Sequence, residues 1–299
     1  MPNEDLTLEE RDLYYGGEIG DFTDPHENTP CRSLVAGQYT DDTQLILAVT
    51  ESLIESNGFN PESLRQKLIE WYDTKDDGRY RGEATKQGIL NMKNGVPWYM
   101  AGVDKAGCGS ATRAIPFGLY YYFDINKAVE YARMASCMTH RHALAKDGAA
   151  CIAATIVNLV NGNIPKINEL QDIVTTNEFK MKLDDVQRCL RKQANPEEAI
   201  QVLGNSSIVH ETVCLSLFHF LSRVSDFALA VKNAANSVAS RKKGDTDSIG
   251  CLAGGMSGAY NSLEAIPAKW ARKVEDTARL KRAARQLYRA ADIGKVPPL

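Results

Sequence analysis

Two short acidic segments carry the residue types that could do chemistry. They are Tyr39-Thr40-Asp41-Asp42-Thr43-Gln44 and Lys243-Gly244-Asp245-Thr246-Asp247-Ser248-Ile249-Gly250. Carboxylates beside hydroxyl groups are hard oxygen ligands, which suit Mg²⁺, Mn²⁺ or Ca²⁺. If the two segments met in space, they could surround a pair of cations about 3.5–4 Å apart, an arrangement that activates a water molecule. The sequence alone does not show that they meet.

Helix capping offers a competing explanation for both segments. Each segment directly precedes an apolar run with helical spacing, beginning at Leu45 and at Ile249. Thr40 suits the N-cap position, and carboxylates in a first turn favour the positive end of the helix dipole. From the residues alone, two independent capped helix starts remain the simpler explanation.

A calcium-binding loop of the EF-hand type is the other competitor for the second segment. If Asp245 is the first position, Gly250 falls at the required sixth place. Ile249 then occupies the fifth place, and Met256 stands where the bidentate glutamate should be. The segment therefore does not encode an EF-hand.

The elements that must position these segments are predicted to be helices. From about residue 43 onward, apolar residues recur at three- and four-residue intervals, and alternation typical of strands is almost absent. The helices expected on this basis are Leu45–Ile54, Pro61–Tyr72, Ile125–Met138, His142–Val160, Leu183–Leu190, Ile208–Leu221, Phe227–Val238, Ile249–Leu263 and Lys269–Ala291.

The connections between these helices predict one domain over residues 1–299. They are short and rich in Asn, Gly and Pro, as helix-to-helix turns are, and none resembles a long linker. The polar stretch from about 165 to 198 suits an inserted helical hairpin. Residues 1–36 are turn-rich and poorly periodic, so we expect an irregular surface lead.

The helix after the second acidic segment is predicted to be central. It contains Gly250, Gly254, Gly255 and Gly258. Each glycine costs a helix up to about 1 kcal/mol relative to alanine, so four of them suggest close packing against neighbours.

Composition excludes several classes of protein. Hydrophobic residues make up 43% and charged residues 24%, which is typical of a globular chain. Lys plus Arg total 35 against 38 Asp plus Glu, a net charge of −3, so nucleic acid is not an expected partner. The seven cysteines show no C-x-x-C spacing, which favours a reducing compartment.

The same reading predicts a cytoplasmic protein without a membrane segment. The start, Met1-Pro2-Asn3-Glu4-Asp5, is acidic and lacks the basic and apolar regions of a signal peptide. No uninterrupted apolar stretch approaches the ~20 residues that span a bilayer. Delivery into another cell by a different signal stays open.

Four further motifs accompany the acidic segments. A Gly-rich loop leads into a helix, a Thr-His segment follows, and two shorter motifs lie toward the end of the chain: Gly107-Cys108-Gly109-Ser110-Ala111-Thr112-Arg113-Ala114-Ile115-Pro116-Phe117-Gly118, Thr139-His140-Arg141-His142, Leu203-Gly204 and Glu264-Ala265-Ile266-Pro267-Ala268-Lys269-Trp270. In this order, the set resembles the ADP-ribosylglycohydrolase family over about residues 36–275.

The resemblance implies a fold and a site. The expected fold is all-α, a single compact orthogonal multi-helix bundle. The expected cofactors are two divalent cations, Mg²⁺ or Mn²⁺, with Asp41 and Asp42 also assisting proton transfer as catalytic residues. By the resemblance, the metal ligands are Thr40, Asp41, Asp42, Asp245, Asp247 and Ser248, and the substrate-binding residues are Gly107, Gly109, Ser110, Ala111, Thr112 and His140.

The resemblance also implies a reaction. The expected activity is hydrolysis of the bond between ADP-ribose and a protein side chain, with arginine or serine as the acceptor. The partners would then be an ADP-ribosylated protein and ADP-ribose itself. The alternative is a non-catalytic relative that binds ADP-ribose or serves structurally. A helical phosphohydrolase ranks last, because no histidine is followed by the aspartate that one large class of these enzymes requires.

The lead departs from the family pattern. Most members begin with a helix carrying Gly-Asp-Ala-x-Gly, with an acidic residue near the metals in some of them. Here the lead contains Tyr15-Gly16-Gly17-Glu18-Ile19-Gly20-Asp21. Whether Glu18 or Asp21 supplies that acidic residue is open at this point.

Overall fold

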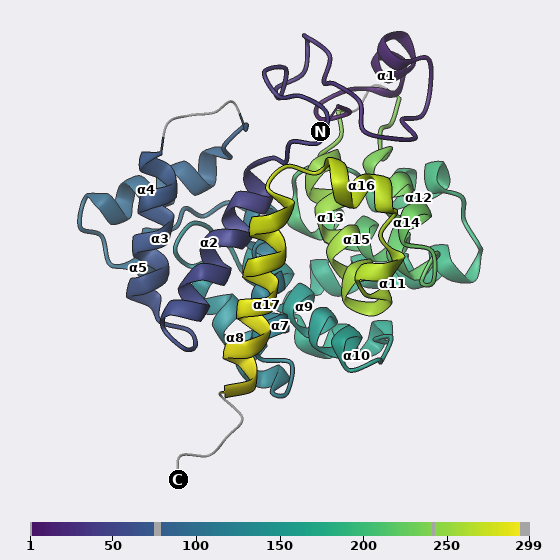
Figure 1. The fold of residues 1–299 in the computed structure, drawn as a ribbon. Helices are drawn as coiled ribbons and strands as arrows, with labels where there is room; N and C mark the ends of the chain where they lie inside the picture. The colour runs from purple at the N-terminus through teal and green to yellow at the C-terminus, as the bar shows by residue number, and fades with distance from the viewer. Residues whose placement is uncertain (1, 75–78, 241–242, 294–299) are drawn as a thin grey trace.

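The structure, a computed structural model, describes residues 2–74, 79–240 and 243–293, with side chains as far as residue 291. Within these ranges, all regular secondary structure is helical, and the extended pairing is confined to two isolated bridges. The all-α bundle predicted from the resemblance is therefore confirmed. Figure 1 shows α3, α4 and α5 on one side and α11 to α14 on the other, with α2 and α17 between them.

The helices have the following bounds. They are α1 (Leu8–Tyr15), α2 (Asp41–Glu55), α3 (Pro61–Asp73), α4 (Glu83–Lys93), α5 (Trp98–Ala101), α6 (Gly109–Thr112), α7 (Ile115–Tyr120), α8 (Ile125–Ser136), α9 (Ala143–Val160), α10 (Ile167–Ile173), α11 (Asn177–Arg191), α12 (Pro196–Leu203), α13 (Val209–Leu221), α14 (Phe227–Ala235), α15 (Thr246–Asn261), α16 (Ala268–Lys273) and α17 (Thr277–Ile293), with a 3₁₀ turn at Leu263–Ala265.

Helix α9 forms the centre of the core. It packs against α8, α7, α6, α15 and α13, so nearly all of its sides are covered. By length and apolar composition it could cross a membrane, but 78% of this stretch is buried inside the protein, as in the core helix of a bundle. Gly148 allows the close approach of α13, because a Cβ atom there would lie 2.2 Å from Val209 Cγ2.

Helix α15 is central, as its glycines predicted. It packs against α14, α13, α9, α2 and α6. At Gly255 the helix lies close to α7, because a Cβ atom there would lie 2.5 Å from Ile115 Cδ1, which would have to move. Its contact with α2 brings together the two helices that begin in the acidic segments.

The structure corrects the prediction for the lead. Residues 1–36 were expected to be an irregular surface loop, but they include α1, which is held by a capping box between Thr7 and Glu10. The lead also buries Leu6, Arg11 and Cys31 against the body of the protein. Turn-forming residues concealed this packing, because their local preferences say nothing about tertiary contacts.

The predicted C-terminal helix is also corrected. The structure divides Lys269–Ala291 into α16 and α17, with a break between them where Asp276 has a φ of 50°. Val274 and Glu275 lie in this break, and the backbone N–H of Glu275 donates to the carbonyl of Gly37 at 2.9 Å. The C-terminal part is thereby tied to Gly37, which directly follows the lead.

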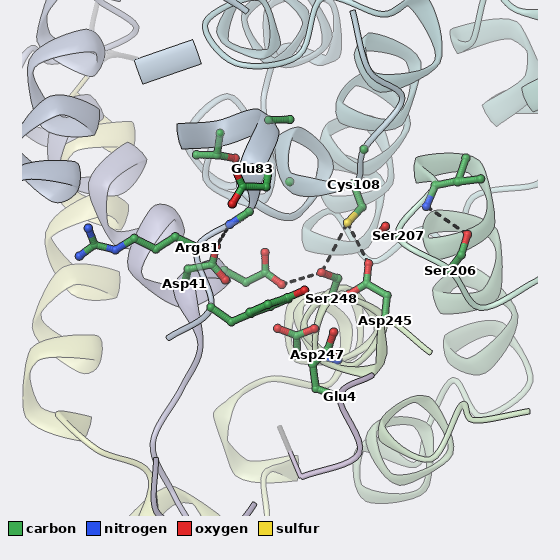
Figure 2. Close-up of a pocket in the computed structure, with 18 of the residues that line it drawn as sticks. Glu4, Asp41, Arg81, Glu83, Cys108, Ser206, Ser207, Asp245, Asp247 and Ser248 are labelled. Carbon is green, nitrogen blue, oxygen red and sulfur yellow. Dashed lines mark hydrogen bonds between the residues drawn. The ribbon is translucent and has the colours of Figure 1, made fainter. Parts of the chain in front are cut away.

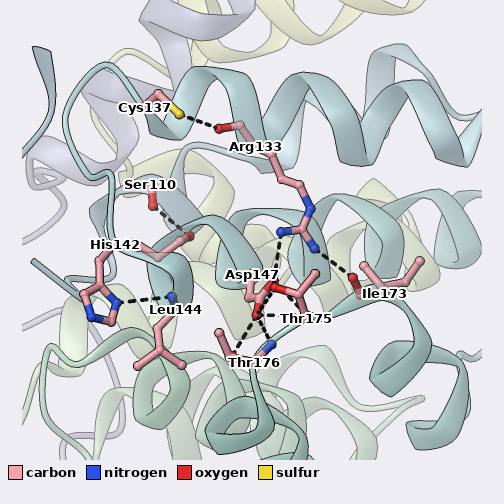
Figure 3. Close-up of polar contacts among 10 residues, drawn as sticks. Ser110, Arg133, Cys137, His142, Leu144, Asp147, Ile173, Thr175 and Thr176 are labelled. Atoms are coloured by element: carbon pink, nitrogen blue, oxygen red, sulfur yellow. Dashed lines mark hydrogen bonds and ion pairs between the residues drawn. The ribbon is translucent and has the colours of Figure 1, made fainter. Parts of the chain in front are cut away.

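The polar stretch near residue 165 forms the expected pair of adjacent helices, α10 and α11. Asp147 on α9 fixes this pair to the core, as Figure 3 shows. The buried Asp147 carboxylate accepts from the backbone N–H of Thr176 at 2.8 Å and pairs with Arg133 of α8 at 2.8 Å. Thr176 is the N-cap of α11, so one carboxylate joins α8, α9 and α11.

Candidate functional site

A cavity of about 820 Å³ opens where the two acidic segments meet. Its wall comes from several parts of the chain: the start of the lead, the beginning of α2, residues 80–86, the 105–109 loop, His140, and the 206–208 and 243–248 segments. Figure 2 shows Glu4, Asp41, Asp245, Asp247 and Ser248 converging on this space. Helix ends and loops supply the wall, so the packing of the bundle sets its geometry.

The meeting of the two acidic helix starts is direct. Ser248 Oγ donates a hydrogen bond of 2.9 Å to Asp42 Oδ2, although the residues are 206 positions apart. The Thr40 side chain is hydrogen-bonded to Asp247. The side chains of Thr40, Asp42, Asp245, Asp247 and Ser248 are all buried, whereas Asp41 is half-buried at the cavity wall.

The competing explanation, two independent caps, does not describe these contacts. Neither Thr40 nor Asp245 makes a side-chain capping hydrogen bond, although each occupies the N-cap position of its helix. The oxygen atoms of Thr40 and Asp245 are directed to the shared cluster and not to the backbone of their own helices. The acidic residues are therefore arranged around a common point.

Backbone contacts hold both helix starts in place. The N–H of Tyr39 donates to Glu275 Oε1 at 2.9 Å, and the N–H of Asp41 donates to the Arg79 carbonyl at 3.3 Å. The N–H of Asp245 donates to the Asn205 carbonyl at 2.8 Å. Gly244 fits here because a Cβ atom would lie 2.7 Å from the Ser237 carbonyl oxygen.

Glu4 is a member of the cluster that the sequence did not identify. Its carboxylate is buried, and Oε2 accepts from the Asp247 backbone N–H at 3.2 Å. The N–H of Asp5 donates to the Gly244 carbonyl at 3.0 Å, which places the lead beside the start of α15. Nothing in the spacing of the acidic start marked Glu4 for this position.

Glu18 and Asp21, the two residues considered for this role, both lie elsewhere. Glu18 is exposed and does not line the cavity. Asp21 accepts hydrogen bonds from Lys269 Nζ at 2.7 Å and Trp270 Nε1 at 2.8 Å, so it ties the lead to α16. Among the described residues of the lead, Glu4 joins the buried acidic cluster, and Asp5 also lines the cavity.

Crowding of buried carboxylates changes their affinity for protons. Burial, followed by repulsion from Asp247, raises the pKa of Asp42 to about 7. Burial and neighbouring carboxylates also raise the pKa of Asp41 and Asp245 well above the usual range. Burial raises the pKa of Glu4 in the same way. Burial also acts to raise the pKa of Asp247, but several smaller effects, among them hydrogen bonds with Glu4, Asp245 and Thr40, together outweigh it and lower this pKa.

The donor set fits a hard divalent cation. Carboxylate oxygen atoms of Glu4, Asp245 and Asp247 lie within 4.8 Å of one another, which is close enough to share an ion. Asp41 and Asp42 stand outside this group of three, and Asp42 is linked to Asp245 through Ser248 and Cys108. Among the described residues, no lysine or arginine forms an ion pair with these carboxylates, so a bound cation would relieve their repulsion.

Cys108 forms the wall beside Asp245. Its thiol donates to Asp245 Oδ2 at 3.0 Å and lies 3.5 Å from Ser248 Oγ. Burial, followed by the charges of Asp245 and Asp42, raises the pKa of this thiol well above its usual range. Cys108 is therefore a neutral hydrogen-bond donor that orients the Asp245 carboxylate.

The predicted substrate-binding residues separate into two groups. Gly107, Gly109 and His140 line the cavity. Ser110, Ala111 and Thr112 are buried and are absent from its wall. Ser110 donates to the Ala145 carbonyl at 3.1 Å, and the Thr112 side chain is hydrogen-bonded to Asp42, so both side chains have partners inside the protein.

The backbone of the Gly-rich loop is hydrogen-bonded to the segment around residues 207–209. The N–H of Cys108 donates to the Ser207 carbonyl at 3.0 Å, and Gly107 forms an isolated bridge with Ile208. The Cys108 N–H is therefore bonded within the protein and is not free for a ligand. The side of the cavity that faces this loop remains suited to a polar ligand, because it is formed by backbone and His140.

Comparison with known proteins gives a consistent result. A family model described as ADP-ribosylglycohydrolase matches residues 1–295. An uncharacterized protein of Archaeoglobus fulgidus is 30% identical, over 96% of this chain and 90% of its own length. The ADP-ribosylhydrolase ARH3 of Xenopus tropicalis is 24% identical, over 78% and 76% of the two chains.

Two further comparisons concern a bacterial enzyme and a solved structure. The ADP-ribosylarginine hydrolase Tri1 of Pseudomonas putida is 23% identical, over 89% of this chain and 70% of its own. A chain of an ADP-ribosylglycohydrolase-related protein complex superimposes with a TM-score of 0.71 at 24% identity, covering 97% of this chain and 92% of that one. The structural likeness concerns the fold.

Proposed function

Because the chain belongs to the ADP-ribosylglycohydrolase family, we propose that it removes ADP-ribose from arginine or serine side chains of modified proteins with the help of bound divalent cations. Family membership and the named relatives show a hydrolase that acts on glycosidic bonds of ADP-ribose. Metal dependence and the linkage are our inference.

The observation that carries the proposal is the convergence of five buried or half-buried carboxylates at one cavity. Glu4 comes from the lead, Asp41 and Asp42 from α2, and Asp245 and Asp247 from α15. Crowded carboxylates without a paired cation are costly in a folded protein, and a metal ion offsets that cost. Two Mg²⁺ or Mn²⁺ ions are the cofactors we propose.

Divalent cations bound there would supply a polarised water molecule and would orient the ribose hydroxyl groups. Side chains of the protein would carry out the proton transfers. Asp41 is the carboxylate placed at the cavity wall, where it accepts from the Gly82 N–H at 3.3 Å. It is positioned to take a proton from the attacking water and to return it to the leaving nitrogen or oxygen.

The proposed hydrolysis consumes one water molecule and needs no further reactant. The water oxygen bonds to the anomeric carbon of the ribose while the bond to the side-chain nitrogen or oxygen breaks. One water proton passes by way of Asp41 to the released side chain, so ADP-ribose and an unmodified residue result. Asp42, held by Ser248, keeps the cluster in place during this exchange.

The cavity suits the proposed substrate. Its volume of about 820 Å³ falls within the range of ~300–1,000 Å³ that ligand sites usually have. Exposed residues such as Lys243 line its rim, so a modified side chain of another protein could reach the acidic cluster. Arginine is the acceptor best supported, because the relative Tri1 is an ADP-ribosylarginine hydrolase. The cytoplasmic location stays a prediction.

The proposal is tested with peptides that carry arginine- or serine-linked ADP-ribose. Wild-type protein should release free ADP-ribose with Mg²⁺ or Mn²⁺ and should lose this activity in a chelator. Asp41→Ala and Asp247→Ala should each reduce turnover at least about a hundredfold, because ligand loss outweighs the 10–100-fold effects of outer-shell changes.

Asp172→Ala is the matched control. Asp172 is exposed on α10, outside the cavity, so its removal should leave turnover unchanged. Far-ultraviolet circular dichroism should show the same helical content in all variants. Undiminished turnover of both Asp41→Ala and Asp247→Ala would reject the site. Binding of ADP-ribose without turnover on any acceptor would favour the non-catalytic alternative.

A further inference from the structure

Arg113 is a buried cation that donates hydrogen bonds to Gly109, Ala135 and Thr139. It is 1% exposed and forms no ion pair with a carboxylate of the described residues. Its guanidinium donates from Nη1 to the Gly109 carbonyl at 3.1 Å and from Nη2 to Thr139 Oγ1 at 2.5 Å. Because arginine only donates, Thr139 Oγ1 must be the acceptor in this contact.

Because Thr139 Oγ1 accepts from Arg113, the hydroxyl proton of Thr139 is free to point toward the adjacent His140. The hydroxyl lies 2.8 Å from Nδ1 of His140, and the Thr139 side chain is fully buried. The hydroxyl proton has no other acceptor in the described part of the chain, and a buried donor without a partner costs about 1–3 kcal/mol. The arrangement therefore favours Thr139 as the donor and Nδ1 of His140 as the acceptor.

His140 is consequently held in one protonation form. Burial, with a contribution from the Arg113 charge, lowers the pKa of His140 to about 3, so the ring is neutral at physiological pH. A neutral imidazole whose Nδ1 accepts a hydrogen bond carries its single proton on Nε2. The contacts thus select the Nε2–H tautomer.

The Nε2 atom faces the cavity, and no described residue forms a hydrogen bond with it. His140 is 3% exposed and lines the cavity beside the Gly-rich loop. A Cβ atom on Gly107 would lie 3.0 Å from Nε2, so glycine leaves the space in front of this atom open. The His140 backbone is fixed at both ends, since its N–H donates to the Ser136 carbonyl and its carbonyl accepts from Ser136 Oγ at 2.9 Å.

We propose that Arg113 and Thr139 are positioning residues that hold His140 as a neutral Nε2–H donor for an acceptor oxygen of the ligand. That the oxygen belongs to a phosphate or a ribose of ADP-ribose rests on the proposed function, whereas the tautomer does not. A protonated Nε2 cannot bind a metal ion, so His140 takes no part in the metal centre.

The tautomer can be measured without substrate or metal. The protein contains five histidines, so ¹⁵N-histidine labelling and long-range ¹H–¹⁵N correlation spectra at pH 7.5 give few signals. His140→Gln identifies the signals of residue 140 by their loss. We expect one protonated nitrogen at Nε2 and one unprotonated nitrogen at Nδ1, with no change down to about pH 5, well above the depressed pKa. An Nδ1–H tautomer or a charged ring at pH 7.5 would overturn the inference.

A variant pair tests the role of Thr139. Thr139→Val removes the hydroxyl at nearly constant volume and should produce a mixed tautomer population. It should also weaken ADP-ribose binding about three- to tenfold, the worth of one hydrogen bond. Thr139→Ser keeps the hydroxyl and should restore both the spectrum and the affinity. Equal tautomer populations in wild type and Thr139→Val would contradict the role of Thr139 in fixing the His140 tautomer.

Thr155→Val is the matched control, because Thr155 is also fully buried but donates to the Cys151 carbonyl within α9. It should leave the His140 signals and ADP-ribose affinity unchanged. A predominant Nε2–H tautomer that depends on Thr139, in a protein that does not bind ADP-ribose, would support the positioning role of Thr139 and reject the proposed function. ADP-ribose turnover by a protein whose His140 ring is protonated at Nδ1 would reject the positioning role alone.

Discussion

Glu4 and Asp247 lie 243 positions apart, yet one donates its backbone N–H to the carboxylate of the other. This contact makes the lead part of the acidic cluster. Asp245 and Asp247 were predictable as ligand types because hydroxyl groups flank them at a helix start. Glu4 was not, since a lone glutamate in an acidic stretch has no spacing that distinguishes it from a solvated residue.

For the single residue Glu4, we expect the substitution Glu4→Gln to weaken Mn²⁺ binding at least about tenfold. The amide keeps the shape of the side chain but removes one negative charge and one strong oxygen ligand from the group of three that can share an ion. Titration calorimetry with Mn²⁺ measures the effect. Glu18→Gln, at an exposed position, should bind like wild type. Equal affinities of the two variants would exclude Glu4 from the metal shell.

Helix starts and helix junctions are the elements that place the site. The periodic pattern located α2 and α15 but began them at Leu45 and Ile249, whereas the structure begins them at Asp41 and Thr246. The difference arises because carboxylates carry no hydrophobic signal, although they belong to the first turn. Short helices such as α1 and α5 escaped prediction, because a few residues give no measurable periodicity.

The junction at Asp147 gives an element-scale prediction. Asp147→Asn should lower the free energy of unfolding by about 3 kcal/mol, because it leaves Arg133 without its buried partner and weakens the hydrogen bonds that hold the start of α11. Urea unfolding at pH 7 measures this value. Asp124→Asn is the control, because asparagine serves equally well as the N-cap of α8.

The same residue sets a pH dependence. Burial alone would raise the pKa of Asp147, but hydrogen bonds from Thr176, Thr175 and Arg133 outweigh burial and lower it. A lowered pKa contributes stability above the ordinary value of about 3.9, and this contribution is lost as the pH falls through the folded-state value. The difference between wild type and Asp147→Asn should therefore shrink in strong acid. A difference that stays constant between pH 7 and pH 2 would contradict this assignment.

For the molecule as a whole, helical periodicity and the near absence of alternation predicted helices, and the family resemblance implied the all-α bundle. Periodicity was insufficient to predict which helix ends meet. That meeting depends on packing, such as the approach of α15 to α7 at Gly255, and on the lead lying against the start of α15. The order of motifs, through the family resemblance, pointed to the shared site; the contact between Ser248 and Asp42 shows how the chain forms it.

The central claim is that two distant helix starts and the lead share divalent cations, and a Mn²⁺ complex tests it most directly. Crystals grown with MnCl₂ should show anomalous difference peaks among Glu4, Asp41, Asp42, Asp245 and Asp247, as a pair about 3.5–4 Å apart. The peaks should disappear in Asp247→Ala crystals under the same conditions. An empty acidic cluster at saturating Mn²⁺, or peaks confined to other parts of the molecule, would contradict the account.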